Sequence, residues 1–401
     1  MNVWIVNPYG TLPSEGWREY RSAMLARALA ARGHTVRWWI SDIEHRSKMR
    51  RSAGVIDPLL PPGITIEVVP ARSYRRNISV GRVLYERSFA TGFSRASSTL
   101  PAPDLMVLAD PSLFFAGPII RFADRVGIPF VLDVLDLWPE LFAITLPGPL
   151  RKHGPLIFGP LYQRRDRLVQ QSAAVVAVTA DYMAEVTKRV QPARSQVVYL
   201  GVDRAALRSP RFDVYPAAPL HVVYAGTLGE AYDMPVVLAA IEHMARSERP
   251  VRFTLAGDGP WQAHVRTLAL QYPQHITFLG QVPASNLADL YATAHIGLAS
   301  YAPGSTVSMP VKFFDYMAAG LATIGSMQGE AGALLRAGAG ESYQAGSVDA
   351  LIAAIERYVR DPAALAQARE FSSHAACEFD QGTQHARFAE LIETIIKSVK
   401  K

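Results

Sequence analysis

The residues best suited to chemistry lie near residue 310, where a polar loop leads into a short predicted helix. Pro310 at the first helical position and Gly320 just past the end predict a helix of about ten residues. The unpaired N–H groups and the positive dipole at the start of a helix form a seat for pyrophosphate. We therefore expect Ser308, Met309, Pro310 and Val311 to contact a diphosphate.

Two charged residues follow on the same helix. Lys312 adds a full positive charge one turn away, where it would stabilise a leaving diphosphate that gains negative charge. Asp315 can accept hydrogen bonds from the paired hydroxyls of a ribose. The structural alternative is a surface ion pair between Lys312 and Asp315, which lie at positions i and i+3. We favour ligand contacts because the surrounding stretch is too apolar for a plain exposed helix face.

Three glycine-rich turns come earlier in the chain, at 226–229, 257–260 and 280–283, each after a predicted strand. Ligands of an open parallel sheet bind outside the carboxyl ends of its strands, so these turns should share one edge of a cleft. Glycine there lets backbone amides approach phosphate or base. For any single turn, a purely structural need for glycine is the alternative. The ligand contacts that we predict from these turns are Gly226, Thr227, Gly257, Gly259 and Val282.

The elements that must position these residues follow from the alternation of β-branched runs with helical patterns, which indicates βαβ units and parallel sheets. One series has predicted strands at 3–6, 35–40, 65–69, 105–108, 129–134, 175–178 and 196–199; the other has them at 221–225, 252–256, 276–279, 296–300 and 321–325. A proline-marked polar connector at 203–219 separates the two series. We predict an α/β protein with domains at 1–203 and 204–375, and a helix at 376–401 that returns to the first domain.

The first domain offers two candidate site residues. Gly16 lies in the turn after the first strand, where a flexible turn without ligand contact is the alternative. Asp136 follows the predicted strand 129–134 at its carboxyl end, where it can face a reacting hydroxyl group or cap the next segment. The sequence has no Asp-x-Asp signature there and no His, Cys or carboxylate cluster with ligand spacing, so we expect no catalytic metal.

The composition is that of a globular protein, with 49% hydrophobic and 19% charged residues. The single cysteine cannot form an internal disulfide, and the first residues read as a strand rather than a signal peptide, so we expect a cytoplasmic location. The longest apolar stretches fall short of the roughly 18 residues that a membrane-spanning helix needs.

Charge and apolar residues together favour contact with a membrane surface. Residues 1–200 carry 25 Lys and Arg against 16 Asp and Glu, whereas the remaining residues carry 16 against 19. Basic clusters at 46–51 and 72–76 suit anionic lipid headgroups or an acidic acceptor, although a solubilising basic face is the alternative. The segment 141–167 interleaves apolar residues with Arg and Lys, which is typical of interfacial membrane contact, unless it packs on its own domain. We therefore expect the protein to bind the surface of the inner membrane. We do not expect it to bind nucleic acid.

Together these motifs resemble the retaining glycosyltransferases of family 4, which have the GT-B architecture of two Rossmann-like domains with parallel sheets facing a central cleft. Two motifs in this order and spacing are the specific ones, at 257–260 and 310–320. Further matches lie at 16–21, 32–36, 200–203 and 226–229. The run Asp136-Leu137-Trp138-Pro139-Glu140 resembles the sequence found in one branch of this family, whose members build bacterial surface polysaccharides, including lipopolysaccharide, on lipid-linked acceptors.

The resemblance implies transfer of a sugar from a UDP- or GDP-sugar to a lipid-linked or saccharide acceptor in polysaccharide or O-antigen biosynthesis. It implies retention of configuration and no cofactor beyond the nucleotide sugar that serves as substrate. It also implies that Gly16 touches the donor diphosphate from the opposite side of the cleft. We take Asp136 and Lys312 as the catalytic residues and Asp315 and the glycine-turn residues as donor contacts.

The sequence departs from the family pattern at two places. The family places two glutamates eight positions apart, where this chain has Val307 and Asp315. It also often has Arg and Lys after the first glycine turn of the donor domain, where this chain has Thr227 and Glu230. The loss of the first glutamate at Val307 keeps open a nucleotide-sugar-binding relative without catalysis. A nucleotide-sugar epimerase or hydrolase also stays open, because that chemistry uses the same two-domain cleft.

Overall fold

A computed structural model describes the chain except residues 17, 19, 20, 53, 209–218 and 401. The chain forms two compact units, one of Met1–Leu200 with Gly382–Lys401 and one of Gly201–Gln381. The sequence-based bounds lie close by, at 203 and 376, and most of the predicted connector falls at 209–218, outside the described residues.

The first unit is built on a parallel sheet whose described strands run in the order β3-β2-β1-β4-β5-β6-β7. The order reverses between β1 and β4, which makes the carboxyl ends of these two strands a topological switch point. All pairs are parallel. The strands are β1 (Asn2–Val6), β2 (Thr35–Ser41), β3 (Ile64–Val69), β4 (Leu105–Asp110), β5 (Phe130–Val134), β6 (Ala174–Ala177) and β7 (Ser195–Val197).

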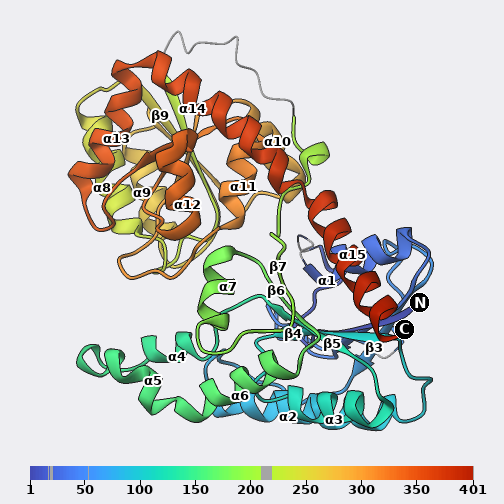
Figure 1. Cartoon of the computed structure of the whole chain (residues 1–401). Helices are drawn as coiled ribbons and strands as arrows, with labels where there is room; N and C mark the ends of the chain where they lie inside the picture. The colour runs from blue at the N-terminus through green and yellow to red at the C-terminus, as the bar shows by residue number, and fades with distance from the viewer. Residues whose placement is uncertain (17, 19–20, 53, 209–218, 401) are drawn as a thin grey trace. The chain divides into compact units, whose positions relative to one another are not determined.

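Helices cover both faces of this sheet because side chains alternate along each strand. In β1, Trp4 and Val6 pack into the core on the side of α2 and α3, whereas Val3 and Ile5 pack with α1 and α15 on the other side. Figure 1 shows α2, α3 and α6 together along one face. The helices are α1 (Arg21–Ala31), α2 (Val80–Ser97), α3 (Ala116–Val126), α4 (Glu140–Ile144), α5 (Gly154–Ile157), α6 (Gly159–Gln171), α7 (Ala180–Thr187) and α15 (Gln381–Val399).

The second unit repeats this plan with a parallel sheet whose described strands run in the order β10-β9-β8-β11-β12-β13. The strands are β8 (Leu220–Ala225), β9 (Val251–Ala256), β10 (Ile276–Gly280), β11 (Ile296–Ala299), β12 (Ala322–Gly325) and β13 (Gly340–Ser342). The helices are α8 (Met234–Arg246), α9 (Gln262–Gln271), α10 (Ala284–Ala292), α11 (Val311–Ala318), α12 (Gly329–Leu334), α13 (Val348–Arg360) and α14 (Pro362–Ala375). The prediction of two Rossmann-like α/β domains is thereby confirmed.

The helix after residue 310 differs from its prediction in one detail. Helix α11 begins at Val311 and has eight residues, so Pro310 is its N-cap rather than its first helical residue. The ring fixes φ of Pro310 at −73°, which suits a helix, but ψ is 143° because the loop arrives in an extended conformation. Gly320 follows the end of the helix with φ of 67°, in the left-handed region expected there.

Candidate functional site

The three glycine turns of the second unit are joined by backbone hydrogen bonds. The amide of Gly226 donates to Ala256 O (2.9 Å), and the amide of Gly257 donates to Gly280 O (2.7 Å). Leu228 N donates to Asp258 O at 2.9 Å, which links the first turn to the second. The parallel strands β8, β9 and β10 therefore end in one continuous rim, as the sequence predicted.

Glycine is required at these turns for two different reasons. A Cβ on Gly257 would lie 1.8 Å from Gly226 O, and one on Gly259 would lie 2.5 Å from Leu228 O, so both positions need glycine to let the turns pack on one another. A Cβ on Gly226 would instead lie 2.9 Å from Nζ of Lys312. Only Gly226 therefore opens space for a side chain that the sequence marks as functional.

Lys312 lies in a pocket of aromatic rings at the start of α11. Its Nζ is 4.1 Å from the ring centroid of Tyr224, 4.5 Å from that of Tyr232 and 5.8 Å from that of Tyr301. The residue as a whole is half-buried, but Nζ is enclosed and makes no hydrogen bond to any described residue. The alternative of an exposed ion pair with Asp315 is wrong, because Asp315 is also buried.

Burial lowers the pKa of Lys312 from its ordinary 10.5 to about 7. The faces of the three tyrosine rings attract the ammonium group but do not replace its lost hydration shell. An anion that reached Nζ would supply the missing hydrogen-bond acceptor and stabilise the charged form. A negatively charged ligand should therefore bind at Lys312 and raise its pKa.

The remaining predicted donor contacts of this unit lie in the same loops. Ser308, Met309 and Pro310 are buried in the segment that enters α11, and Val311 is half-buried. Thr227 is exposed in the first turn, where its carbonyl accepts a hydrogen bond from the hydroxyl of Tyr224 at 2.6 Å. Val282 is half-buried in the turn after β10.

Gly16 ends the short 3-10 helix η1 (Pro13–Glu15) of the first unit. Its φ is 73°, and a Cβ would meet no atom within 4 Å, so the backbone angle alone explains the glycine. The residue is exposed. Its contact with a ligand stays a prediction.

A cavity of about 310 Å³ lies at the switch point of the first unit, and Asp136 lines it. Asp136 is half-buried, and its Oδ1 accepts a hydrogen bond from Leu137 N at 2.9 Å. Burial raises the pKa of Asp136, so its carboxylate accepts a proton more readily than an exposed one. Five of the other residues that line the cavity are Asn7, Arg21, Trp38, Arg82 and Asp110.

Asp110 closes strand β4 and faces the same cavity. Its Oδ1 accepts hydrogen bonds from Ser112 N (2.7 Å) and Ser112 Oγ (2.6 Å). Burial raises its pKa to about 6 despite these bonds. Asp110 was not among the residues predicted from the sequence, although a carboxylate at the carboxyl end of a buried strand is a signal that points to such a site.

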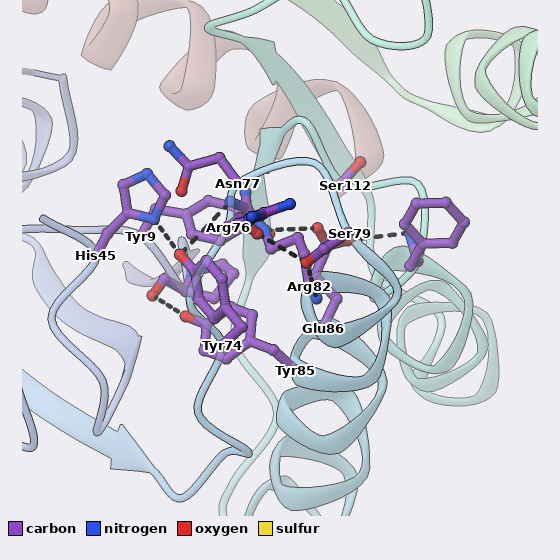
Figure 2. Close-up of polar contacts among 12 residues, drawn as sticks. Tyr9, His45, Tyr74, Arg76, Asn77, Ser79, Arg82, Tyr85, Glu86 and Ser112 are labelled. Carbon is purple, nitrogen blue, oxygen red and sulfur yellow. Dashed lines mark hydrogen bonds and ion pairs between the residues drawn. The ribbon is translucent and has the colours of Figure 1, made fainter. Parts of the chain in front are cut away.

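Arg82 reaches the cavity from α2 and is fixed by a buried polar cluster (Figure 2). Its Nε donates to the hydroxyl of Tyr9 (3.0 Å) and to Oε1 of Glu86 (3.1 Å), and its guanidinium lies 3.9 Å from the centroid of the Tyr9 ring. His45, which bonds Tyr74, is kept neutral because burial and the nearby cations lower its pKa to about 3. No sequence signal pointed to Arg82 or Glu86, which form an i, i+4 pair.

Solved structures share this fold over nearly the whole chain. A sucrose-phosphate synthase from Thermosynechococcus elongatus gives a TM-score of 0.76 at 15% identity, with 99% of each chain covered. The Anabaena protein HepE in complex with UDP-glucose gives 0.66 at 13% identity, with 98% of this chain and 99% of that chain covered. WaaG, a glycosyltransferase involved in lipopolysaccharide biosynthesis, gives 0.65 at 15% identity with the same coverage.

Family models match both units. The model "Glycosyl transferase 4-like domain" matches residues 19–203, and "Glycosyl transferases group 1" matches residues 219–361. The chain belongs to the glycosyltransferases with the GT-B fold. This glycosyltransferase is also 26% identical over 133 residues to the putative colanic acid biosynthesis glycosyltransferase WcaL of Escherichia coli, covering 32% of each chain. It is 25% identical over 215 residues to WcaL of Salmonella typhimurium, covering 51% of this chain and 52% of the relative.

Proposed function

We propose that this glycosyltransferase moves a sugar from a UDP- or GDP-sugar to a lipid-linked or saccharide acceptor. The observation that carries the proposal is Lys312, whose enclosed Nζ lies beside Gly226 without a hydrogen-bond partner among the described residues. A diphosphate would supply what Nζ lacks, because it carries both negative charge and oxygens that accept hydrogen bonds. The complexes of HepE with UDP and with UDP-glucose support a nucleotide sugar as donor.

The proposed reaction breaks the bond between the anomeric carbon and the diphosphate and forms a bond to the acceptor oxygen on the same face of the sugar. The hydroxyl proton of the acceptor leaves with the diphosphate. Lys312 and the amino terminus of α11 stabilise the charge that develops on the leaving group, so the reaction needs no metal ion. Asp136 orients the acceptor hydroxyl, and Asp315 binds the ribose.

We place the reaction in the synthesis of a bacterial surface polysaccharide. The WcaL relatives are named for colanic acid biosynthesis, and WaaG is named for lipopolysaccharide biosynthesis. The WcaL alignments span about a third and about half of those proteins, so the acceptor comes to this chain as a proposal.

We also propose that the first unit meets the cytoplasmic face of the inner membrane through the segment 148–157. Leu156 is 81% exposed and Ile157 is 47% exposed on α5, and Arg151 and Lys152 lie exposed just before them. Exposed apolar side chains beside cations suit the interface of an anionic bilayer. None of the helices in the described residues combines the length and hydropathy of a membrane span.

The first prediction tests the donor site. Lys312→Ala should lower turnover of the cognate nucleotide sugar by about 100-fold or more, because the leaving diphosphate loses its charged partner. The measurement is transfer to a saccharide acceptor, followed by mass spectrometry, after a thermal-shift screen of nucleotide sugars has found the donor.

Two controls make this test decisive. The variant's melting temperature must match that of the wild type, since removing a buried lysine also changes packing. Incubation with donor alone separates transfer from hydrolysis or epimerisation. Wild-type turnover by Lys312→Ala, or tight donor binding without transfer to any acceptor, would contradict the proposal.

A further inference from the structure

The cavity beside Asp136 contains polar atoms that the proposed reaction does not use. Nη1 and Nη2 of Arg21, Nε1 of Trp38 and Oδ2 of Asp110 are buried and make no hydrogen bond within the described part of the chain. All three residues line the cavity, and none is more than 2% exposed. Buried polar groups in native proteins nearly always have partners, so these atoms point to a ligand that completes them.

Asp133 holds Arg21 through Nε, so that the edge of the guanidinium with Nη1 and Nη2 can bind a ligand. Its Nε donates to both carboxylate oxygens of Asp133, at 3.0 and 3.1 Å, and the group lies 5.1 Å from the ring centroid of Phe388 on α15. Asp133 fixes the position of the group and balances its charge. The two terminal nitrogens, each with two N–H groups, form a rigid fork that has no acceptor among the described residues.

The chemistry of the unpaired atoms selects the class of ligand. Arg21 and Trp38 offer only donors, whereas Asp110 offers a single acceptor oxygen. A carboxylate or phosphate presents two oxygens that match both arms of a guanidinium fork, and a neutral hydroxyl presents one. Net charge does not decide the matter, because Asp133 and Glu86 balance Arg21 and Arg82.

We propose that this cavity binds an oxyanion, a carboxylate or a phosphate, carried by the acceptor sugar. Arg21 binds the oxyanion through Nη1 and Nη2, Trp38 Nε1 donates a further hydrogen bond, and Asp110 Oδ2 accepts one from a neighbouring hydroxyl. Arg82, fixed by Glu86 and Tyr9, provides a second guanidinium at the cavity wall (Figure 2). That the acceptor sugar carries the oxyanion rests on the proposed function, whereas the oxyanion site itself does not.

The test is titration calorimetry without a nucleotide sugar, using methyl glucuronide, glucose 1-phosphate and the neutral methyl glucoside as probes. We expect at least one charged probe to bind the wild type ten or more times as tightly as the glucoside, and the tighter of the two distinguishes carboxylate from phosphate. Arg21→Lys should lose this preference, since lysine has a charge but no fork. The Lys312→Ala variant should keep it, which separates this site from the donor site.

A second variant guards against misfolding. Arg21→Met combined with Asp133→Asn removes both members of the buried pair, so that no charge is left alone in the core. It should fold and should also lose the preference for charged probes. Equal affinity for charged and neutral probes in the wild type would overturn the proposal, as would a tenfold preference retained by either Arg21 variant.

Discussion

At the scale of single residues, the ammonium group of Lys312 is the most telling feature of the second unit. The group lies among three tyrosine rings instead of water, and this environment brings its pKa to about 7. A lysine with this pKa is only about half charged near neutral pH, whereas an exposed lysine is fully charged. Donor binding should therefore include uptake of a proton.

The second prediction follows from this pKa. Binding a diphosphate favours charged Lys312, so the affinity for the nucleotide sugar should fall as pH rises above about 7, by up to about tenfold per pH unit. Calorimetry in buffers of different ionisation enthalpy measures the proton uptake directly. Lys312→Met should bind more weakly and show no such pH dependence. A wild-type affinity that stays constant from about pH 6 to pH 9 would rule out the linkage.

The third prediction concerns Gly226. Gly226→Ala would force a Cβ to within 2.9 Å of Lys312 Nζ at a φ of 146°, so we expect about tenfold weaker donor binding and a small loss of stability. Gly229→Ala is the matched control, because its Cβ would lie 3.4 Å from Thr227 Cγ2 and its φ is not in the left-handed region. Equal donor affinities in the two variants would contradict this role of Gly226.

A single site residue can be predicted from the sequence only where its role depends on its neighbours in the chain. Pro310, Lys312 and Gly320 could be predicted because helix capping and charge are encoded within one turn. The rings around Lys312 could not, since Tyr224, Tyr232 and Tyr301 come from three separate segments. Arg21 and Asp133 are 112 residues apart in the chain and meet only because α1 and β5 contribute to the same core on one face of the sheet.

At the scale of elements, strand periodicity and turn chemistry predicted the sheets well. The strand predicted at 105–108 is observed as Leu105–Asp110, and its two extra residues include the carboxylate that lines the cavity. Helix α2 gave a weaker signal, because the buried Arg82–Glu86 pair lies on the same inner face as its apolar residues and interrupts their pattern.

The fourth prediction tests α5 as a membrane contact. Leu156→Glu should reduce binding to vesicles of phosphatidylglycerol and phosphatidylethanolamine by roughly tenfold, because burying a leucine side chain is worth about 1.5–3 kcal/mol. Leu270→Glu on α9 is the control, since Leu270 is 77% exposed but belongs to the second unit. Co-sedimentation measures both variants. Equal losses would show that the effect of Leu156→Glu is not specific to α5.

At the scale of the whole molecule, the first unit is made from both ends of the chain. Phe388, Ala389 and Ile392 of α15 pack with Leu25 and Leu29 of α1 in one core. At the surface, Arg32 Nε and His34 Nε2 both lie 2.8 Å from Oε1 of Glu393. These contacts tie the last helix to the first residues of the fold.

The fifth prediction uses this tie. Hydrogen bonds from Arg32 and His34 lower the pKa of Glu393 to about 2, so ionised Glu393 stabilises the fold above its ordinary pKa of 4.5, and this contribution is lost as pH falls towards 2. Because Glu393 and its two partners are partly exposed, Glu393→Gln should lower the free energy of unfolding by about 1 kcal/mol or less at neutral pH. The difference in melting temperature from the wild type should shrink below about pH 4.5.

Glu390→Gln is the control for that measurement. Glu390 lies 3.6 Å from Arg32 and its side chain is 60% exposed, so its loss should cost less at every pH. A Glu393→Gln effect that does not vary with pH would mean that the carboxylate charge is not what stabilises α15.

The order of the chain also sets the order in which the molecule can be completed during synthesis. Domains usually fold as they leave the ribosome, with the amino-terminal one first. Here the core between α1 and the sheet lacks Phe388 and Ile392 until α15 has been translated. The continuous second unit is translated before α15, so the amino-terminal part of the first unit should keep part of one apolar face exposed to water until α15 packs on it.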